Sequence, residues 1–191
     1  VKKSGIVGLG GAGFPTYVKF ATDKKIDTLV INGAECEPYI TSDSAVMVEN
    51  ADDILLAIET ADKYFNFDKI VIGIEKNKPS AIAKMNELSQ KNSKIQVKVL
   101  PSVYPQGGEK VLVYHTTGRT IAVGQLPADA GCIVCNSSTM ANIGKYLQTG
   151  MPLVEKVVTV DGGAVKEPKN VIAPIGTDAD KNYEFVNATV G

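Results

Sequence analysis

Residues 28–38 read TLVINGAECEP, four apolar or β-branched residues that give way to a polar turn. A short apolar run bounded by Asn and Gly is typical of a buried strand. Similar runs recur along the chain and are separated by longer stretches with helical spacing, which predicts an α/β fold: a Rossmann-like layered domain with a mostly parallel sheet. We expect its strands at 28–31, 69–74, 95–100 and 132–135.

Three stretches have the spacing of amphipathic helices. We expect one helix over 42–65 and another over 79–90, which opens with a proline near its start. A third should cover 138–148, with Ser137 or Ser138 as its cap and Gly150 as a left-handed terminator. Its buried face should contain Met140, Ile143 and Leu147.

After Pro152 the pattern changes to short β-branched stretches, at 157–160 and 171–175, around a turn-forming Asp-Gly-Gly. We therefore expect an α/β domain over 1–152 and a small β domain over 153–191 whose core is incomplete within this sequence. The chain has no initiating methionine and begins almost inside a glycine-rich motif, so we interpret it as a fragment of a longer subunit.

The composition excludes several classes of function. Of the 191 residues, 44% are hydrophobic and 21% charged, and no run approaches the roughly 18 apolar residues of a membrane span. Twenty basic residues against 21 acidic ones argue against nucleic acid as a ligand. Three cysteines do not make an even disulfide framework, which favours a reducing compartment, the cytoplasm.

The most informative motif is residues 8–16, GLGGAGFPT, with glycines at 8, 10, 11 and 13. Such a loop brings bare amides close to a phosphate or a flat ring, and Lys19 follows within reach of an anion. A plain NAD-binding Rossmann motif would need a strand ahead of Gly8 and a helix opening at Gly13, and the sequence meets neither condition well. A turn without a ligand is the other alternative.

Three further polar turns follow expected strands: residues 32–38, 104–110 and 136–139. Ligands of parallel α/β sheets collect at the carboxyl ends of strands and at helix amino ends. We expect these turns and the glycine-rich motif to converge on one crevice.

The cysteines and the single histidine give weaker signals. Cys132 and Cys135 have metal or redox spacing, but in a strand they point to opposite faces, and no second pair completes a metal site. Two core cysteines are one interpretation, and electron exchange with a nearby cofactor is the other. Cys36 should lie near the cofactor, and His115, expected at a helix end, has no nucleophile spaced around it for hydrolysis.

Four stretches together resemble the RnfC family, the peripheral nicotinamide-oxidising subunit of an ion-translocating ferredoxin:NAD oxidoreductase, related to the flavoprotein subunit of respiratory complex I. They are residues 8–16, 32–41, 104–110 and 126–129. The resemblance implies flavin mononucleotide (FMN) as cofactor and NADH as substrate. It also implies that residues 153–191 begin a β-grasp (soluble ligand binding) domain, with iron-sulfur clusters only in a missing carboxyl-terminal part.

The resemblance implies roles for individual residues. Glu35 and Glu109 would be catalytic. Cofactor binding would involve Gly8, Gly10, Gly11, Gly13, Lys19, Asn32, Glu35, Gly107, Gly108, Asn136 and Thr139. No metal ligand is expected. Leu9 stands where complex I relatives have arginine, and Gly108 and Glu109 where they have an acidic pair, which makes nicotinamide binding less secure than flavin binding.

The resemblance also implies partners: other subunits of a membrane-bound electron-transport complex, with the chain cytoplasmic, peripheral to the membrane and without direct insertion. Two alternatives stay open. One is a scaffold or docking module that has lost the cofactor, and the other is an RnfC-like electron donor of a proline reductase system.

Overall fold

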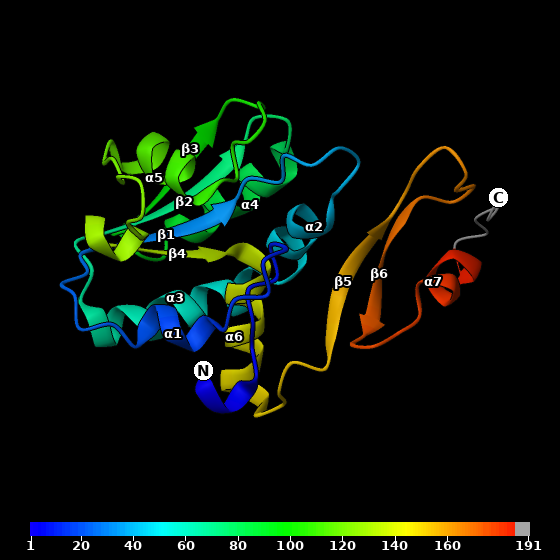
Figure 1. Cartoon of the computed structure of the whole chain (residues 1–191), viewed down its shortest axis with the longest axis horizontal. Coiled ribbons are helices and arrows are strands. Elements are labelled where there is room, and N and C mark those ends of the chain that lie inside the picture. Colours follow the sequence, from blue (N-terminus) through cyan, green and yellow to red (C-terminus); the bar gives the residue numbers. More distant parts are fainter. Residues whose placement is uncertain (186–191) are drawn as a thin grey trace.

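A computed structural model of the chain describes residues 1–185, and its centre is a four-stranded parallel sheet (Figure 1). The strand order is β3-β2-β1-β4, with Leu29 beside both Ile70 and Ile133. The predicted α/β fold and all four predicted strands are confirmed. They are β1 (Thr28–Gly33), β2 (Lys69–Glu75), β3 (Ile95–Leu100) and β4 (Cys132–Asn136).

Helices cover both faces of this sheet. The larger core lies on the face of Leu29 and Ile31, and the smaller core, around Val30 and Leu112, lies on the face that α5 covers. Short 3-10 helices form at Lys2–Ser4 and Pro127–Ala130. The α-helices are α1 (Thr16–Phe20), α2 (Ser42–Glu49), α3 (Ala51–Phe65), α4 (Pro79–Ser89), α5 (Glu109–Thr117), α6 (Ser137–Thr149) and α7 (Ala179–Phe185).

The single helix predicted over 42–65 is wrong, because the structure has two helices that meet at Asn50. This residue has φ −114° and ψ 31°, outside the helical region, and ends α2 while it precedes α3. Its side-chain amide donates to Asp53 Oδ2 at 3.5 Å in the first turn of α3. Apolar spacing continues across the break, so the periodicity alone does not reveal it.

Helix α6 differs from the prediction in two details. Its cap is Asn136, whose Oδ1 accepts a hydrogen bond from Thr139 N at 3.0 Å, so Ser137 and Ser138 lie inside the first turn. Leu147 is 43% exposed rather than buried. Helix α3 crosses α6 at Gly144, where an added Cβ would lie 2.0 Å from a backbone oxygen of α3, so the buried stripe passes through Gly144 and leaves Leu147 on its rim.

The predicted β-rich end is a two-stranded antiparallel sheet, β5 (Glu155–Val160) and β6 (Lys169–Pro174), which Figure 1 shows beside α2. Its small core contains Val160 and Val171, and Thr41 N donates to Thr159 Oγ1 at 3.0 Å. The last six residues of the predicted second domain lie outside the described residues, and the boundary at 152 stays a prediction. Among residues 1–185, no helix is long and apolar enough to cross a membrane.

Candidate functional site

The glycine-rich motif forms a tight turn that leaves backbone amides free. Gly8 N donates to Phe14 O at 2.8 Å, which closes the turn. Gly11 and Gly13 have φ angles of 109° and 61°, a region that residues with a side chain rarely adopt. Within residues 1–185, the amides of Gly10, Gly11 and Ala12 have no hydrogen-bond acceptor. These three donors are available to an anion or a ring carbonyl.

This turn is attached to the start of α6. Leu9 N donates to Thr139 Oγ1 at 2.9 Å. Gly10 lies directly against Asn136, because a Cβ at position 10 would be 3.3 Å from the Asn136 side-chain nitrogen. Two of the predicted turns are therefore in contact, and glycine at position 10 is what allows the approach.

The second contact joins the end of β1 to the turn before α5. Asn32 Nδ2 donates to Gly107 O at 2.9 Å. A Cβ at Gly107 would lie 2.9 Å from Ala34 O, so only glycine fits there without movement. Gly108 caps α5 and Glu109 begins it, as the sequence predicts for this turn.

Lys19 and Glu109 complete the crevice. Lys19 Nζ donates to Glu109 Oε1 at 2.5 Å and to Val134 O at 2.9 Å, so its ammonium group lies between α1, α5 and the edge strand β4. The pair is partly exposed, which leaves it accessible to a ligand. All four predicted turns are thus linked, in pairs, around the carboxyl ends of β1 and β4.

Glu35 is placed differently. Its Oε1 accepts hydrogen bonds from Asp43 N at 2.8 Å and Ser42 Oγ at 3.3 Å, so it holds the first turn of α2. Its Oε2 accepts from Lys78 Nζ at 2.9 Å, in a pair whose side chains are 3% and 11% exposed. The carboxylate therefore reaches the crevice only through the residues that it positions.

Asp43 connects Glu35 to the crevice, and the sequence prediction missed it. Its Oδ2 accepts from Asn136 Nδ2 at 2.7 Å and its Oδ1 from Ser138 Oγ at 2.5 Å. Removal from water raises the pKa of Asp43 above its ordinary value, although the bond from Ser138 opposes the shift. Asp43 fixes the orientation of the side chain that packs on Gly10. An acidic residue in a helix's first turn is the one signal of this role.

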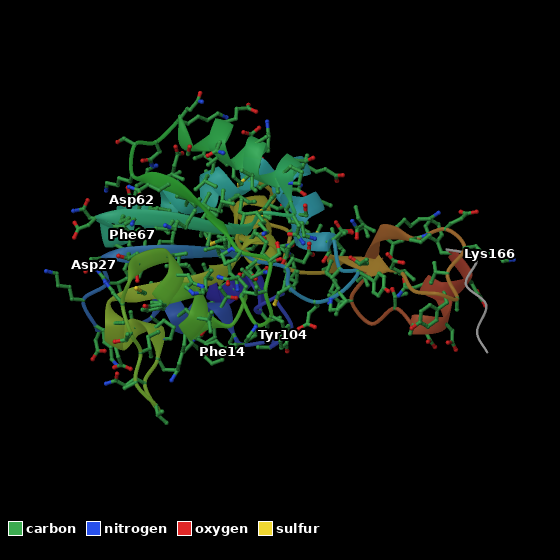
Figure 2. The ribbon with its side chains drawn as sticks, turned by 90° about the horizontal axis from the view of Figure 1, so that it is seen from above. Phe14, Asp27, Asp62, Phe67, Tyr104 and Lys166 are labelled. Atoms are coloured by element: carbon green, nitrogen blue, oxygen red, sulfur yellow. The ribbon has the colours of Figure 1, made fainter. Side chains whose placement is uncertain are left out.

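A cavity of about 430 Å³ adjoins the glycine-rich turn. Phe14, Val18 and Leu126 give it apolar walls, and Lys19 and Glu109 lie at its polar end. In Figure 2, Phe14 and Tyr104 lie well away from Asp27, which precedes β1 at the opposite edge of the sheet. The crevice and this cavity share the carboxyl edge, where such sheets bind ligands.

Cys132 and Cys135 are buried and belong to the cores on opposite faces of the sheet, as the alternation predicts. Burial raises the pKa of the Cys135 thiol to about 12, so it stays protonated at neutral pH. Cys36 lies beside Gly107, near the crevice. His115 is in the last turn of α5, where its Nδ1 is 2.7 Å from Gln106 Nε2. Residues 1–185 contain no cluster of three acidic, Cys or His side chains able to hold a metal ion.

Comparison with known proteins agrees with this geometry. The family model of the Nuo51 FMN-binding domain matches residues 1–145. The chain belongs to this family. The matched region contains every residue that the sequence predicts for the cofactor site.

Curated relatives of this Nuo51-type domain are similarly named. The subunit designated C in the proton-translocating ferredoxin:NAD(+) oxidoreductase complex of Clostridium ljungdahlii is 46% identical over 97% of this chain and 41% of its own length. Its counterpart in the Na(+)-translocating complex of Acetobacterium woodii is 44% identical over 92% of this chain and 40% of its own length. These relatives confirm the RnfC resemblance. The chain spans about two fifths of their length.

Among solved structures, the NAD+-reducing NiFe-hydrogenase in its H2-reduced state matches with a TM-score of 0.81 and 19% identity. The match covers 97% of this chain and 38% of that one, and it shows that the two share a fold.

Proposed function

We propose that the crevice around the glycine-rich turn binds FMN, and that the domain passes electrons between NAD(H) and a further acceptor. The observation that carries this proposal is the junction of separate turns through two hydrogen bonds, Leu9 N to Thr139 Oγ1 and Asn32 Nδ2 to Gly107 O. The family match and the names of the relatives support the same cofactor and reaction class.

The chemistry of the crevice fits a flavin nucleotide. The free amides of the glycine-rich turn, the Lys19 ammonium and the start of α6 suit a phosphate group. Ser137 Oγ at that helix start is buried without a hydrogen-bond partner among the described residues, a further polar atom that a ligand or water would satisfy. Asn32 and the Gly107–Gly108 backbone suit the polar edge of a ring.

The cavity beside the crevice fits the second substrate. Its apolar walls at Phe14 and Leu126 suit a flat heterocycle, and Glu109 lies where it would touch a bound nicotinamide nucleotide. Glu109 is therefore the residue we assign to substrate contact, while Glu35 positions α2. When bound, FMN supplies two-electron exchange with nicotinamide and one-electron exchange with an acceptor. The protein residues supply orientation and exclude water.

The acceptor and the partners extend beyond the residues of this chain. We propose iron-sulfur clusters in the remaining part of the full-length protein as acceptors, and other subunits of an ion-translocating complex as partners. The length of the relatives, of which this chain covers about two fifths, leaves room for such clusters. A peripheral, cytoplasmic position follows from the same proposal.

A flavin titration tests the proposal. The full 191-residue chain should quench FMN fluorescence saturably. Gly10→Val should weaken binding at least about tenfold, because the new side chain meets Asn136. Gly163→Ala is the matched control, since an added Cβ there meets nothing within 4 Å. Absence of quenching by a folded chain would exclude the flavin and favour the docking-module alternative.

A further inference from the structure

A second cavity, of about 310 Å³, lies at the carboxyl ends of β1, β2 and β3. Its walls are the segment 35–41, the segment 75–78 without Lys76, and residues 102–104. Glu35 is the one predicted cofactor-site residue among those lining it. Nothing in the proposed electron transfer uses this cavity.

The charges around this cavity are unbalanced. Glu35, Glu37 and Glu75 face it with Lys78 as the one basic residue among the described lining residues. Lys78 Nζ donates to Glu35 Oε2 at 2.9 Å and to Ile40 O at 3.0 Å. The ammonium thus neutralises Glu35, and the cavity keeps an excess of negative charge whenever Glu75 is ionised.

Glu75 is the unusual member of this group. It is 1% exposed, and its carboxyl has no hydrogen-bond partner among residues 1–185. Ser102 Oγ, also in the cavity wall, is likewise buried without a partner. Burial raises the pKa of Glu75, Lys78 lowers it and Glu35 raises it, with a net upward shift. A buried carboxyl without a donor is costly, so most such groups have a partner in the functional state.

The mouth of the cavity is aromatic. Tyr39 and Tyr104 both line it and are 73% and 72% exposed, and Figure 2 shows Tyr104 at the molecular surface. Tyrosine faces attract organic cations. A metal ion is not indicated, because the described residues hold no cluster of three acidic, Cys or His ligands.

We infer that this cavity binds an organic cation, an alkylguanidinium or alkylammonium group, with Glu75 as its buried counter-ion and the two tyrosines at its mouth. The cation would be either a free small molecule or the arginine or lysine side chain of a partner protein. On binding, the Glu75 proton passes to solvent and the ionised carboxylate accepts hydrogen bonds from the ligand. The inference does not depend on flavin binding.

Calorimetric titration with methylguanidinium chloride tests it, at constant ionic strength and in two buffers of different ionisation enthalpy. The full 191-residue chain should bind saturably and release protons. Glu75→Gln should bind at least about tenfold more weakly and release none, because a neutral amide replaces the counter-ion. Glu49→Gln, an exposed carboxylate on α2 outside the cavity, should bind like the parent chain.

A peptide arm identifies the source. If acetyl-Gly-Arg-Gly-amide binds more tightly than methylguanidinium, the natural ligand is a protein side chain, and otherwise it is a free cation. Absence of saturable binding, or parent-like affinity in Glu75→Gln, would overturn the inference. If that variant does not fold, exposed Glu37→Gln replaces it, with an expected loss of about twofold or more. An unchanged affinity there would overturn the inference equally.

Discussion

The two cavities at the carboxyl edge of the sheet have opposite chemistry. The one beside β4 is larger, about 430 Å³ against 310 Å³, has apolar walls and contains a partly exposed ion pair. The one above β1 to β3 is lined by carboxyl groups, and its ion pair, Glu35 with Lys78, is almost fully buried. One edge of one sheet therefore offers a site for flat nucleotides and, a few residues away, a site for positive charge.

The difference shows how the same residue types serve different purposes. Lys19 and Lys78 each contact one glutamate and one backbone carbonyl. Exposure leaves Lys19 free to exchange its partner for a ligand, whereas burial makes Lys78 part of the framework that holds α2. Asp43 joins the two regions, since its amide binds Glu35 and its carboxylate binds Asn136.

The largest effect should come from breaking the buried pair. Lys78→Met leaves Glu35 buried without its counter-ion, and we expect the free energy of unfolding to fall by about 3–5 kcal/mol. Urea denaturation measures it. Lys84→Met, which removes an exposed pair with Glu87, is the control and should change stability by less than about 1 kcal/mol. Equal losses would mean that the two regions do not differ as described.

A smaller loss is expected where the backbones approach. Gly107→Ala places a Cβ 2.9 Å from Ala34 O, so the turn before α5 must move. We expect a destabilisation of about 1–3 kcal/mol together with weakened FMN binding. Gly163→Ala provides the comparison in both measurements. Parent-like flavin affinity in Gly107→Ala would show that this turn does not touch the cofactor.

The pH dependence should separate the cavities. Because the folded-state pKa of Glu75 is raised above its ordinary 4.5, its contribution to stability is full below that value and is lost as pH rises through the folded pKa. The slope is at most about 1.4 kcal/mol per pH unit for one proton. Glu75→Gln should flatten it, leaving the smaller contribution in the same direction from Asp43. A slope that survives unchanged would contradict the assignment.

The smallest stability effect should come from the exposed pair. Lys19→Met should cost less than about 1 kcal/mol of unfolding free energy, because both partners are partly exposed. It should nevertheless weaken FMN binding, and riboflavin binding should change much less because riboflavin lacks the phosphate. Equal losses for the two flavins would place Lys19 away from the phosphate.

Local pattern was sufficient for the strands and most helices. The apolar runs that predict β1 to β4 match the observed strands within two residues, because buried strands are specified by their own composition. The break at Asn50 was not predictable from spacing, since the apolar period continues through it. Asn136 replaced the serines as cap because its side chain also meets Asp43, a contact fixed by tertiary packing.

The candidate site was predictable as a set of turns and not as a set of contacts. Glycines after strands indicate close backbone approach, but nothing local pairs Asn32 with Gly107, 75 residues away. Glu35 was assigned to the ring from the family resemblance, whereas the structure gives it a buried pair with Lys78, 43 residues away. Long-range ion pairs leave no signature in sequence spacing, so their residues were missed.

The most direct test of the flavin site is a nitrogen-15 NMR titration of the labelled chain with FMN. The amides of Gly10, Gly11, Ala12 and Gly108, together with the Asn136 side chain, should shift most, because these groups surround the proposed crevice. Saturable shifts confined to residues 8–13, 32–35, 107–109 and 136–139 are the predicted result. Shifts centred elsewhere, or none at saturating FMN, would contradict it.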